Sequence, residues 1–161
     1  MSKHKEEKTN VMRTLEQKKI PYTAHSYDPE GPIDGVSVAQ TLGQPPEQVF
    51  KTLVTKGASG AYYVFDIPVA ENLDLKKAAK AVGEKSVAML PQKELLPLTG
   101  YVHGGCSPVG MKKQFPTVFH ETVELFDTIC VSAGKIGAQV EVAPADLIAL
   151  LGAQTADVTA E

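Results

Sequence analysis

The sequence has few cysteines and no excess of positive charge, and each shortage excludes a class of protein. Only two of its 161 residues are cysteines, Cys106 and Cys130, which is too few for the disulfide framework of a small secreted domain. Sixteen Lys and Arg against nineteen Asp and Glu give a formal net charge of −3. This balance excludes a generally basic nucleic-acid-binding surface and leaves only a local basic cleft.

Long hydrophobic runs and metal-ligand patterns are also missing. No segment reaches membrane-spanning length, and the polar residues 1–10 lack the apolar core of a signal peptide. The histidines, at positions 4, 25, 103 and 120, are scattered and show no paired metal-ligand spacing. We therefore expect a cytoplasmic protein that does not enter a membrane and holds no metal ion or other cofactor.

The composition that is present is typical of one globular domain. Hydrophobic residues make up 43% of the chain and charged residues 22%, which is enough apolar surface for a full core. The chain has no internal repeat, low-complexity block or dividing linker. We expect a flexible tail over residues 1–10 and a single domain over residues 11–161. The mixture of hairpins and single helices predicts an α+β fold.

Hydrophobic periodicity, interrupted by Gly and Pro, predicts the individual elements. The clearest is a hairpin, in which strands 50–55 and 61–67 flank a glycine-containing loop. Helix 75–82 is predicted with Asp74 as N-cap, Gly83 at its end, and Leu75 in its buried stripe. A helix is also expected over 11–19, with Thr9 or Asn10 as its N-cap, and another over 37–42, beginning at Ser37. Two more helices are expected over 91–96 and 144–151. Further strands are expected over 22–27, 86–90, 117–120, 128–132 and 139–142.

Residues 100–113, GYVHGGCSPVGMKK, combine glycine, hydroxyl, thiol, imidazole and ammonium groups in a turn-rich segment typical of an anion-binding loop. Gly105 and Gly110 have the spacing of the glycines in a P-loop. However, Met111 and Lys112 stand where a P-loop has its lysine and its magnesium-binding Ser or Thr. The sequence therefore argues against a P-loop nucleoside triphosphatase.

The side chains that could do chemistry each have an ordinary alternative. Cys106 and His103 could form a thiolate–imidazole pair, although a free cysteine is more often a small buried apolar residue. Ser107 lacks a Gly-x-Ser-x-Gly elbow and suits hydrogen bonding across the turn better than nucleophilic attack. Cys130, between Ile and Val in a predicted strand, is expected in the core. By its position alone, Lys51 is a solvated lysine on a strand.

Four segments in order along the chain resemble the YbaK-type Cys-tRNA(Pro) deacylases. They are 49–53 (VFKTL), 73–80 (LDLKKAAK), 99–113 with its glycines, and 140–147 (VEVAPADL), and the match runs from about residue 11 to residue 151. The resemblance implies a mixed, curved, barrel-like β-sheet flanked by several short helices. It also implies release of a wrongly attached amino acid from the 3′ end of tRNA. Cysteine and proline are close in size, so a synthetase pocket rejects one poorly and a second site must destroy the product.

The same resemblance implies roles for individual residues. Lys51 would bind the terminal adenosine and its phosphate, and Gly104 and Gly105 would stabilise the oxyanion through their backbone amides. The remaining substrate-binding residues would be Tyr27, Phe50, Ser107, Pro108 and Asp146. Because the net charge is negative, we expect tRNA contacts to be confined to Lys51 and to five tRNA-binding lysines, Lys76, Lys77, Lys80, Lys112 and Lys113. The thiol of the substrate's own cysteine would attack the ester, so the enzyme needs no nucleophile.

Two other functions stay open from the sequence. One is a deacylase for alanine or serine on tRNA, and the other is a catalytically idle module that binds a tRNA end or a synthetase. The expected partner is mischarged tRNA(Pro), with Cys-tRNA(Cys) as a second candidate substrate and prolyl-tRNA synthetase as a candidate partner. The oligomeric state, and any part of His103 or Cys106 in the chemistry, are not determined by the sequence.

Overall fold

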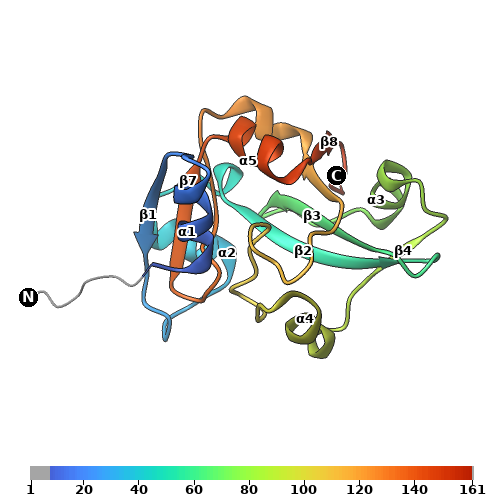
Figure 1. Ribbon diagram of the computed structural model, residues 1–161, viewed down its shortest axis with the longest axis horizontal. Coiled ribbons are helices and arrows are strands. Elements are labelled where there is room, and N and C mark those ends of the chain that lie inside the picture. The colour runs from blue at the N-terminus through green and yellow to red at the C-terminus, as the bar shows by residue number, and fades with distance from the viewer. Residues whose placement is uncertain (1–7, 161) are drawn as a thin grey trace, which may run out of the picture.

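The computed structural model describes residues 8–160, which form two β-sheets with helices packed around them (Figure 1). Its helices are α1 (Asn10–Gln17), α2 (Gly35–Leu42), α3 (Leu75–Val82), α4 (Gln92–Thr99), α5 (Pro144–Leu151) and the 3-10 helices η1 (Pro46–Gln48) and η2 (Glu121–Leu125). Its strands are β1 (Tyr22–Ser26), β2 (Phe50–Gly57), β3 (Tyr62–Pro68), β4 (Val87–Met89), β5 (Thr117–His120), β6 (Ile129–Ser132), β7 (Ala138–Val142) and β8 (Gln154–Ala156). Within this range no helix has both the length and the apolar character needed to cross a membrane.

The strands form two open sheets. A three-stranded antiparallel sheet has the order β1-β7-β6, and a five-stranded mixed sheet has the order β4-β2-β3-β5-β8. In the larger sheet, β5 runs parallel to β3 and to β8, and a bridge between Val49 and Cys130 links the two sheets. The predicted α+β class and mixed sheet are confirmed. The term barrel-like describes the sheets only loosely, because neither sheet is closed and each keeps two edge strands.

The predicted hairpin is confirmed as β2 and β3, which pair antiparallel with Lys51 opposite Ile67 and Thr52 opposite Asp66. The strands extend a little beyond the predicted bounds. On the other side of β2, β4 pairs only with residues 55–57. The first half of β2 is therefore an edge of the larger sheet without a ladder partner on this side, although β6 of the smaller sheet contacts β2 and the Val49–Cys130 bridge lies next to its start.

The helices α1, α2 and α3 each begin at a residue whose side chain caps the first turn, and two of these starts correct the prediction. The Thr9 hydroxyl accepts a hydrogen bond from the Met12 amide and begins α1, so the predicted tail ends earlier than residue 10. Residues 1–7 of that tail lie outside the described residues. α2 begins at Gly35 rather than near Ser37, because Asp34 is its N-cap and accepts from the Ser37 amide.

α3 was predicted with its correct bounds and one wrong burial. Asp74 caps its first turn and Gly83 ends it in the left-handed conformation. Ala78 and Ala79 are buried in a cluster with the side chains of β3. Leu75 is 40% exposed instead of buried, because the helix packs on the sheet through its small alanine face.

Strand β8, the 3-10 helix η2 and the last residues of α4 were not predicted from the sequence. β8 is a three-residue strand that forms by pairing with β5, and so short a segment carries no readable alternation. α4 runs on to Thr99 with Pro97 inside its last turn. Cys130 is 1% exposed, which confirms its predicted place in the core, and both cysteines are free and buried.

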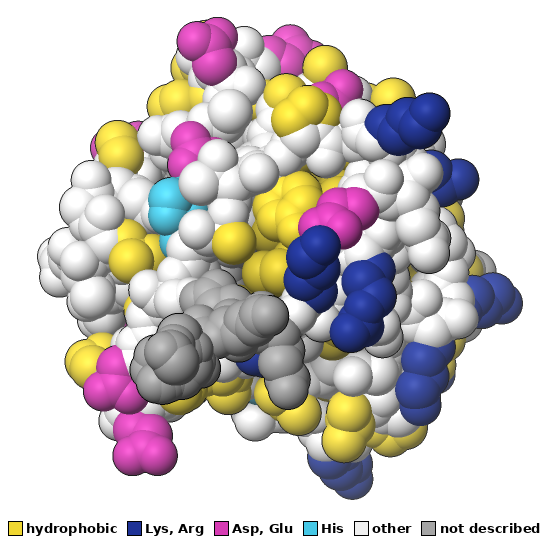
Figure 2. Space-filling model, turned by 60° about the vertical axis from the view of Figure 1, so that its left-hand side comes forward, with side chains coloured by type: hydrophobic (Ala, Val, Ile, Leu, Met, Phe, Trp, Pro, Cys, Tyr) yellow, Lys and Arg dark blue, Asp and Glu magenta, His cyan; other side chains and the backbone are white. Residues whose placement is uncertain are grey.

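Charged side chains are unevenly spread over the surface. On the face drawn in Figure 2, Lys and Arg gather along one side and most Asp and Glu lie toward the other. The net charge of the whole chain is −3, so this local gathering is the basic surface that composition alone cannot reveal.

Candidate functional site

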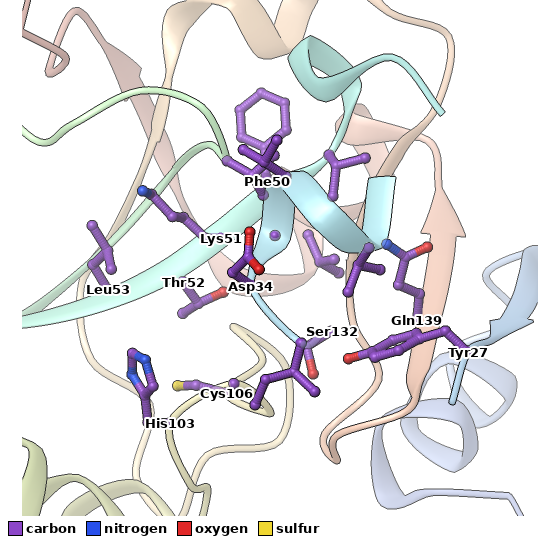
Figure 3. Close-up of a pocket in the computed structure, with 18 of the residues that line it drawn as sticks. Tyr27, Asp34, Phe50, Lys51, Thr52, Leu53, His103, Cys106, Ser132 and Gln139 are labelled. Carbon is purple, nitrogen blue, oxygen red and sulfur yellow. The ribbon is translucent and has the colours of Figure 1, made fainter. Parts of the chain in front are cut away.

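A pocket of about 350 Å³ lies where the two sheets meet (Figure 3). The larger sheet contributes the edge of β2, residues 49–53, and the smaller sheet contributes Val131, Ser132 and Gln139. Further walls come from residues 33–36 at the start of α2 and from the loop that carries His103, Gly104 and Cys106, and single side chains elsewhere complete the lining: Tyr27, Val38, Val69 and Leu95. Segments far apart in the sequence therefore close one cavity.

The pocket wraps around the free edge of β2. Lys51 and Thr52 are neighbours in an extended strand, so their side chains leave it on opposite faces. Both nevertheless line the cavity, and Figure 3 shows them leaving the strand in different directions. This part of β2 allows it because no strand is paired in a ladder along this edge to separate its two faces.

Lys51 supplies the pocket with a cation that the fold leaves available. The residue is half-buried, and burial lowers the pKa of its ammonium below the ordinary value, while the charge of Glu71 opposes that shift. Within residues 8–160 its Nζ atom makes no hydrogen bond. Two other polar side chains of the walls are already paired: Gln139 exchanges hydrogen bonds with Gln44, and Ser132 Oγ accepts from the Gly134 amide.

Gly104 brings backbone to the cavity surface. It has φ +90°, and a Cβ built there would lie 3.2 Å from Ile33 Cδ1, so a larger residue would be strained and crowded. Gly105 lies outside the pocket walls. Its amide donates to the Val102 carbonyl at 2.9 Å, so it is not free to donate to a substrate. The structure brings one of the two predicted oxyanion glycines to the cavity.

Ser107 and Pro108 support the loop from beneath. Both are buried, and neither lines the cavity. Ser107 Oγ accepts from the Val109 amide at 3.2 Å, which is the cross-turn hydrogen bond expected from the sequence. Tyr101 donates its hydroxyl to the Val109 carbonyl at 2.5 Å. The loop is thus held by its own contacts and presents only its first half to the pocket.

Cys106 lines the pocket as a neutral thiol. Burial raises the pKa of its thiol to about 12, and the charge of Asp66 adds to the rise. His103 also lines the cavity but is exposed, and no hydrogen bond joins it to the sulfur among the described residues. A reactive cysteine needs a lowered pKa and an electropositive surrounding. The geometry therefore argues against a thiolate–imidazole pair.

Asp66 and Thr52 are site residues that sequence reasoning missed. Thr52 lines the pocket and donates its hydroxyl to Asp66 at 2.5 Å, and Asp66 itself is fully buried behind it. A lone acidic residue inside the apolar strand YYVFDIP is the signal that could have found this pair. Asp34, the N-cap of α2, is an exposed carboxylate that also lines the pocket.

Comparison with known proteins identifies the family of this chain. The aminoacyl-tRNA editing domain matches residues 34–150, a range that contains nearly every wall of the pocket. The chain belongs to this family. EbsC of Enterococcus faecalis, whose name proposes a Cys-tRNA(Pro)/Cys-tRNA(Cys) deacylase, is 47% identical over 161 residues, which cover 99% of this chain and 98% of EbsC.

Solved structures share the fold of this editing domain. One described as a proposed trans-editing enzyme for prolyl tRNA synthetase has a TM-score of 0.84 and 28% identity, over 94% of this chain and 95% of that one. The hypothetical protein APE2540 has a TM-score of 0.86 over 94% of this chain and all of its own, but at 22% identity it supports the fold alone. As a member of the family, the protein is an enzyme that hydrolyses aminoacyl-tRNA.

The other predicted site residues of this editing domain are divided between the pocket walls and the rest of the molecule. Phe50 and Tyr27 line it, but Asp146, in the first turn of α5, does not. None of the five predicted tRNA-binding lysines lines it either. Lys77 donates to Asp157 and to the Thr159 carbonyl, each at 3.0 Å. Figure 1 places α3 at the opposite end of the larger sheet from α2, which forms part of the pocket.

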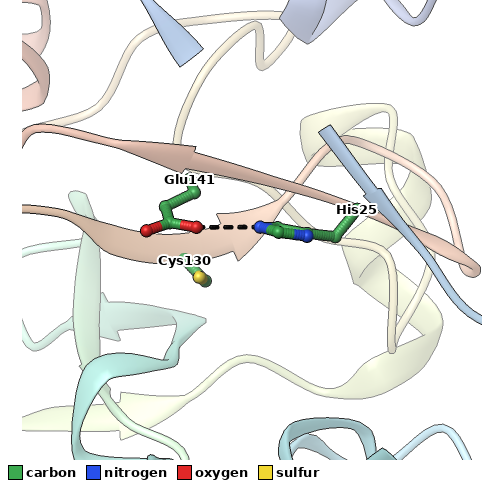
Figure 4. A group of neighbouring side chains, drawn as sticks. All are labelled: His25, Cys130 and Glu141. Carbon is green, nitrogen blue, oxygen red and sulfur yellow. Dashed lines mark hydrogen bonds and ion pairs between the residues drawn. The ribbon is translucent and has the colours of Figure 1, made fainter. Parts of the chain in front are cut away.

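A second cluster of reactive side chains lies on the smaller sheet (Figure 4). The ligand-type atoms of His25, Cys130 and Glu141 lie within 4.8 Å of one another. The Glu141 carboxylate accepts a hydrogen bond from the Thr128 hydroxyl at 2.5 Å and shares another with His25 Nε2 at 2.8 Å. Both hydrogen bonds lower the pKa of the Glu141 carboxyl. Burial raises the pKa of Cys130 to about 12. The hydrogen bonds already engage both oxygens of the carboxylate, so the cluster is explained as a cross-strand network without an ion.

Proposed function

We propose that this editing domain removes cysteine from mischarged tRNA(Pro) and so corrects prolyl-tRNA synthetase in trans. The observation that carries the proposal is the half-buried Lys51 ammonium, which has no hydrogen-bond partner among residues 8–160 and shares a cavity with Gly104. The name of EbsC points to the same substrate, and the 28% identical structure is described as a trans-editing enzyme for the same synthetase.

The pocket suits the aminoacyl end of tRNA in size and charge. A cavity of about 350 Å³ holds a small aminoacyl ester, and it is too small for the acceptor stem. In the proposed complex Lys51 pairs with the phosphate of the terminal adenosine as a point charge. The amide of Gly104 donates to the ester carbonyl as negative charge develops on its oxygen.

The proposed reaction uses the thiol of the substrate. The thiol loses its proton, its sulfur bonds to the ester carbonyl carbon, and the ester C–O bond breaks. The released ribose oxygen takes up a proton, which leaves free tRNA(Pro) and a cysteine thiolactone that water opens to cysteine. The enzyme contributes orientation and charge stabilisation, because attack within one molecule needs little else. The neutral thiol of Cys106 does not compete with the substrate's sulfur.

A deacylation assay with Cys-tRNA(Pro) tests the role of Lys51. We expect Lys51→Ala to lower kcat/KM by about a hundredfold or more, since a charged group at the phosphate and its positioning effect are both lost. Lys85→Ala, which removes an exposed lysine outside the pocket, is the matched control and should keep wild-type activity. Near-normal activity of a folded Lys51→Ala protein would refute the assigned role.

The same assay separates the alternative functions. Release of alanine or serine from tRNA(Pro) in place of cysteine would identify a deacylase of different specificity, and no release from any of the three would identify a binding module. We expect Cys106→Ala to change cysteine release by less than about threefold, because a neutral buried thiol is no nucleophile. A large loss in that variant would restore the enzyme-thiol mechanism.

We also propose prolyl-tRNA synthetase as a partner that supplies selectivity for tRNA(Pro). The pocket accommodates only the 3′ end, which all tRNAs share, so identity of the tRNA must be recognised elsewhere. Recruitment to the synthetase raises the effective concentration of the mischarged product. Co-sedimentation of the two purified proteins with tRNA(Pro) tests this association.

A further inference from the structure

A buried carboxyl group behind the pocket has a hydrogen-bond partner on only one of its two oxygens among the described residues. Asp66, on β3, has no exposed surface, and its Oδ1 atom accepts the hydroxyl of Thr52 at 2.5 Å. Its Oδ2 atom is buried and has no hydrogen-bond partner among the described residues. Leaving an acidic oxygen buried and unpaired destabilises a fold, so its retention calls for a functional explanation.

The Asp66 carboxyl group determines whether the Thr52 hydroxyl in the pocket wall can donate or accept a hydrogen bond. Thr52 lines the cavity, and its single hydroxyl hydrogen is committed to Asp66. Its oxygen can therefore only accept a hydrogen bond from a ligand. Cys106, on a facing wall, is close enough to Asp66 for the carboxylate charge to raise the pKa of its thiol. Negative potential from Asp66 thus reaches the cavity between Thr52 and Cys106.

The Thr52 oxygen can only accept a hydrogen bond, and the Asp66 carboxylate makes the potential around it negative. This part of the cavity therefore favours a ligand group that is positively charged and donates a hydrogen bond. An aminoacyl ester offers one such group, its α-ammonium, whereas its carbonyl and the adenosine phosphate are acceptors. The ribose hydroxyls can donate but carry no charge. Lys51 leaves β2 on the opposite face from Thr52, so anion and cation subsites lie on either side of the same strand.

We propose that Thr52, oriented by Asp66, forms the subsite for the α-ammonium group of the aminoacyl ester. Thr52 contacts the ammonium, and Asp66 is a positioning residue that holds the hydroxyl and, in its ionised form, supplies the charge. This inference rests on the proposed deacylase function and adds to it the means by which the reactive ester is oriented.

Asp34 is the competing carboxylate. It also lines the pocket, but it is exposed, and its Oδ2 atom accepts the Ser37 amide at the start of α2. The Ser37 hydrogen bonds lower the pKa of its carboxyl, so it is charged at neutral pH. Water and the helix N-terminus weaken its attraction for a ligand cation. Asp34→Asn is therefore a matched control for Asp66→Asn.

The test compares two tRNA(Pro) substrates that differ only in the ammonium. Cysteinyl-tRNA(Pro) carries the thiol, the ester and the ammonium, and 3-mercaptopropionyl-tRNA(Pro) carries the first two alone. We expect the wild type to prefer the cysteinyl substrate by about tenfold or more in kcat/KM, the size typical of a charge-assisted hydrogen bond. Thr52→Val and Asp66→Asn should reduce this preference to less than threefold, while Thr52→Ser and Asp34→Asn keep it.

Two outcomes overturn the inference. One is a wild-type preference retained in folded Thr52→Val and Asp66→Asn proteins, and the other is a preference lost in Asp34→Asn instead. A merely structural role for Asp66 would lower activity on both substrates equally and leave the ratio unchanged, so that outcome also contradicts it.

A binding measurement keeps this test separate from the proposed reaction. Adenosine carrying cysteine in a 3′-amide cannot be deacylated, and its 3-mercaptopropionyl analogue lacks the ammonium. Calorimetric titration should give the same preference of about tenfold in Kd and the same losses in the variants. If wild type released no amino acid from any tRNA, the proposed function would be wrong, and the ratio of these two affinities would still decide the subsite.

Discussion

At the scale of single residues, Asp66 makes the free energy of unfolding depend on pH. Burial raises the pKa of its carboxyl to about 7 from an ordinary value of 3.8, with the Thr52 hydrogen bond opposing the rise. Between these values the folded protein holds a proton that the unfolded chain has released. Its contribution to the free energy of unfolding therefore decreases as pH rises through this window and is constant above it.

We expect Asp66→Asn to raise the free energy of unfolding at pH 8 by about 1–3 kcal/mol, because the amide has no charge to keep out of water. At pH 4 the difference should vanish, since the wild-type carboxyl is then protonated in the fold. Urea denaturation at the two pH values measures it, with the exposed Glu47→Gln as control. An equal effect of Asp66→Asn at both pH values would contradict this account.

Residue identity predicted which chemical groups would lie in the site, but not which would face the cavity. Among the residues to which the family resemblance gives catalytic or substrate-binding roles, Lys51, Gly104, Phe50 and Tyr27 line the pocket. Gly105 does not, because neighbouring glycine amides in a turn point in different directions and its own is taken by Val102. Spacing along a loop cannot show which amide remains free.

At the scale of elements, the loop 100–113 is a packed structure rather than an open cradle. A Cβ built on Gly105 would lie 2.9 Å from the Ile136 amide nitrogen and 3.0 Å from the Lys135 carbonyl carbon. Those atoms belong to backbone that follows β6, so they cannot turn aside as a flexible side chain would. Glycine is required at this position by packing between two loops.

We expect Gly105→Ala to lower the free energy of unfolding by about 1–3 kcal/mol, the usual cost of overpacking a tight contact. Gly31→Ala, where the nearest atom would lie 3.6 Å from the new Cβ, should change it by less than about 0.5 kcal/mol. Thermal and urea unfolding give both values. Equal stability of the two variants would show that the loop yields more easily than its contacts indicate.

Helices and hairpins were predictable where local signals act alone. Asp74 and Gly83 define α3 through a cap and a left-handed turn, both of which are properties of the local sequence. β8 and the burial of Leu75 were not predictable, because each depends on what the rest of the chain brings alongside.

At the scale of the whole molecule, the predicted tRNA-binding lysines divide into two groups. Lys112 and Lys113 end the loop that supplies Gly104 to the pocket, and Lys112 donates to the Pro97 carbonyl at 3.3 Å. The lysines of α3 lie at the far end of the larger sheet (Figure 1). A tRNA whose 3′ end occupies the pocket reaches the first group before the second.

We expect the Lys112→Ala/Lys113→Ala double variant to weaken tRNA binding more than Lys76→Ala/Lys80→Ala does. It should also reduce the slope of log Kd against log salt concentration by about 1–2, since each phosphate contact releases about 0.7–0.9 of a counterion. Filter binding with uncharged tRNA(Pro) over a salt series measures both quantities. A larger loss in the α3 variant would place the tRNA body across the other end of the molecule.

The sequence by itself determined the α+β class, both ends of α3 and α5 and the β2–β3 hairpin, because caps, turns and alternation act over a few residues. Lys51 was singled out by the family resemblance, since its position alone indicates only a solvated lysine on a strand. Only the tertiary structure decided that the sheets stay open and that the edge of β2 meets β6, β7 and the glycine loop around one cavity. It alone placed Asp66 behind Thr52, since a hydrogen bond across paired strands depends on register. Register is set by packing of the whole chain, and so is the direction in which each polar group of the site points.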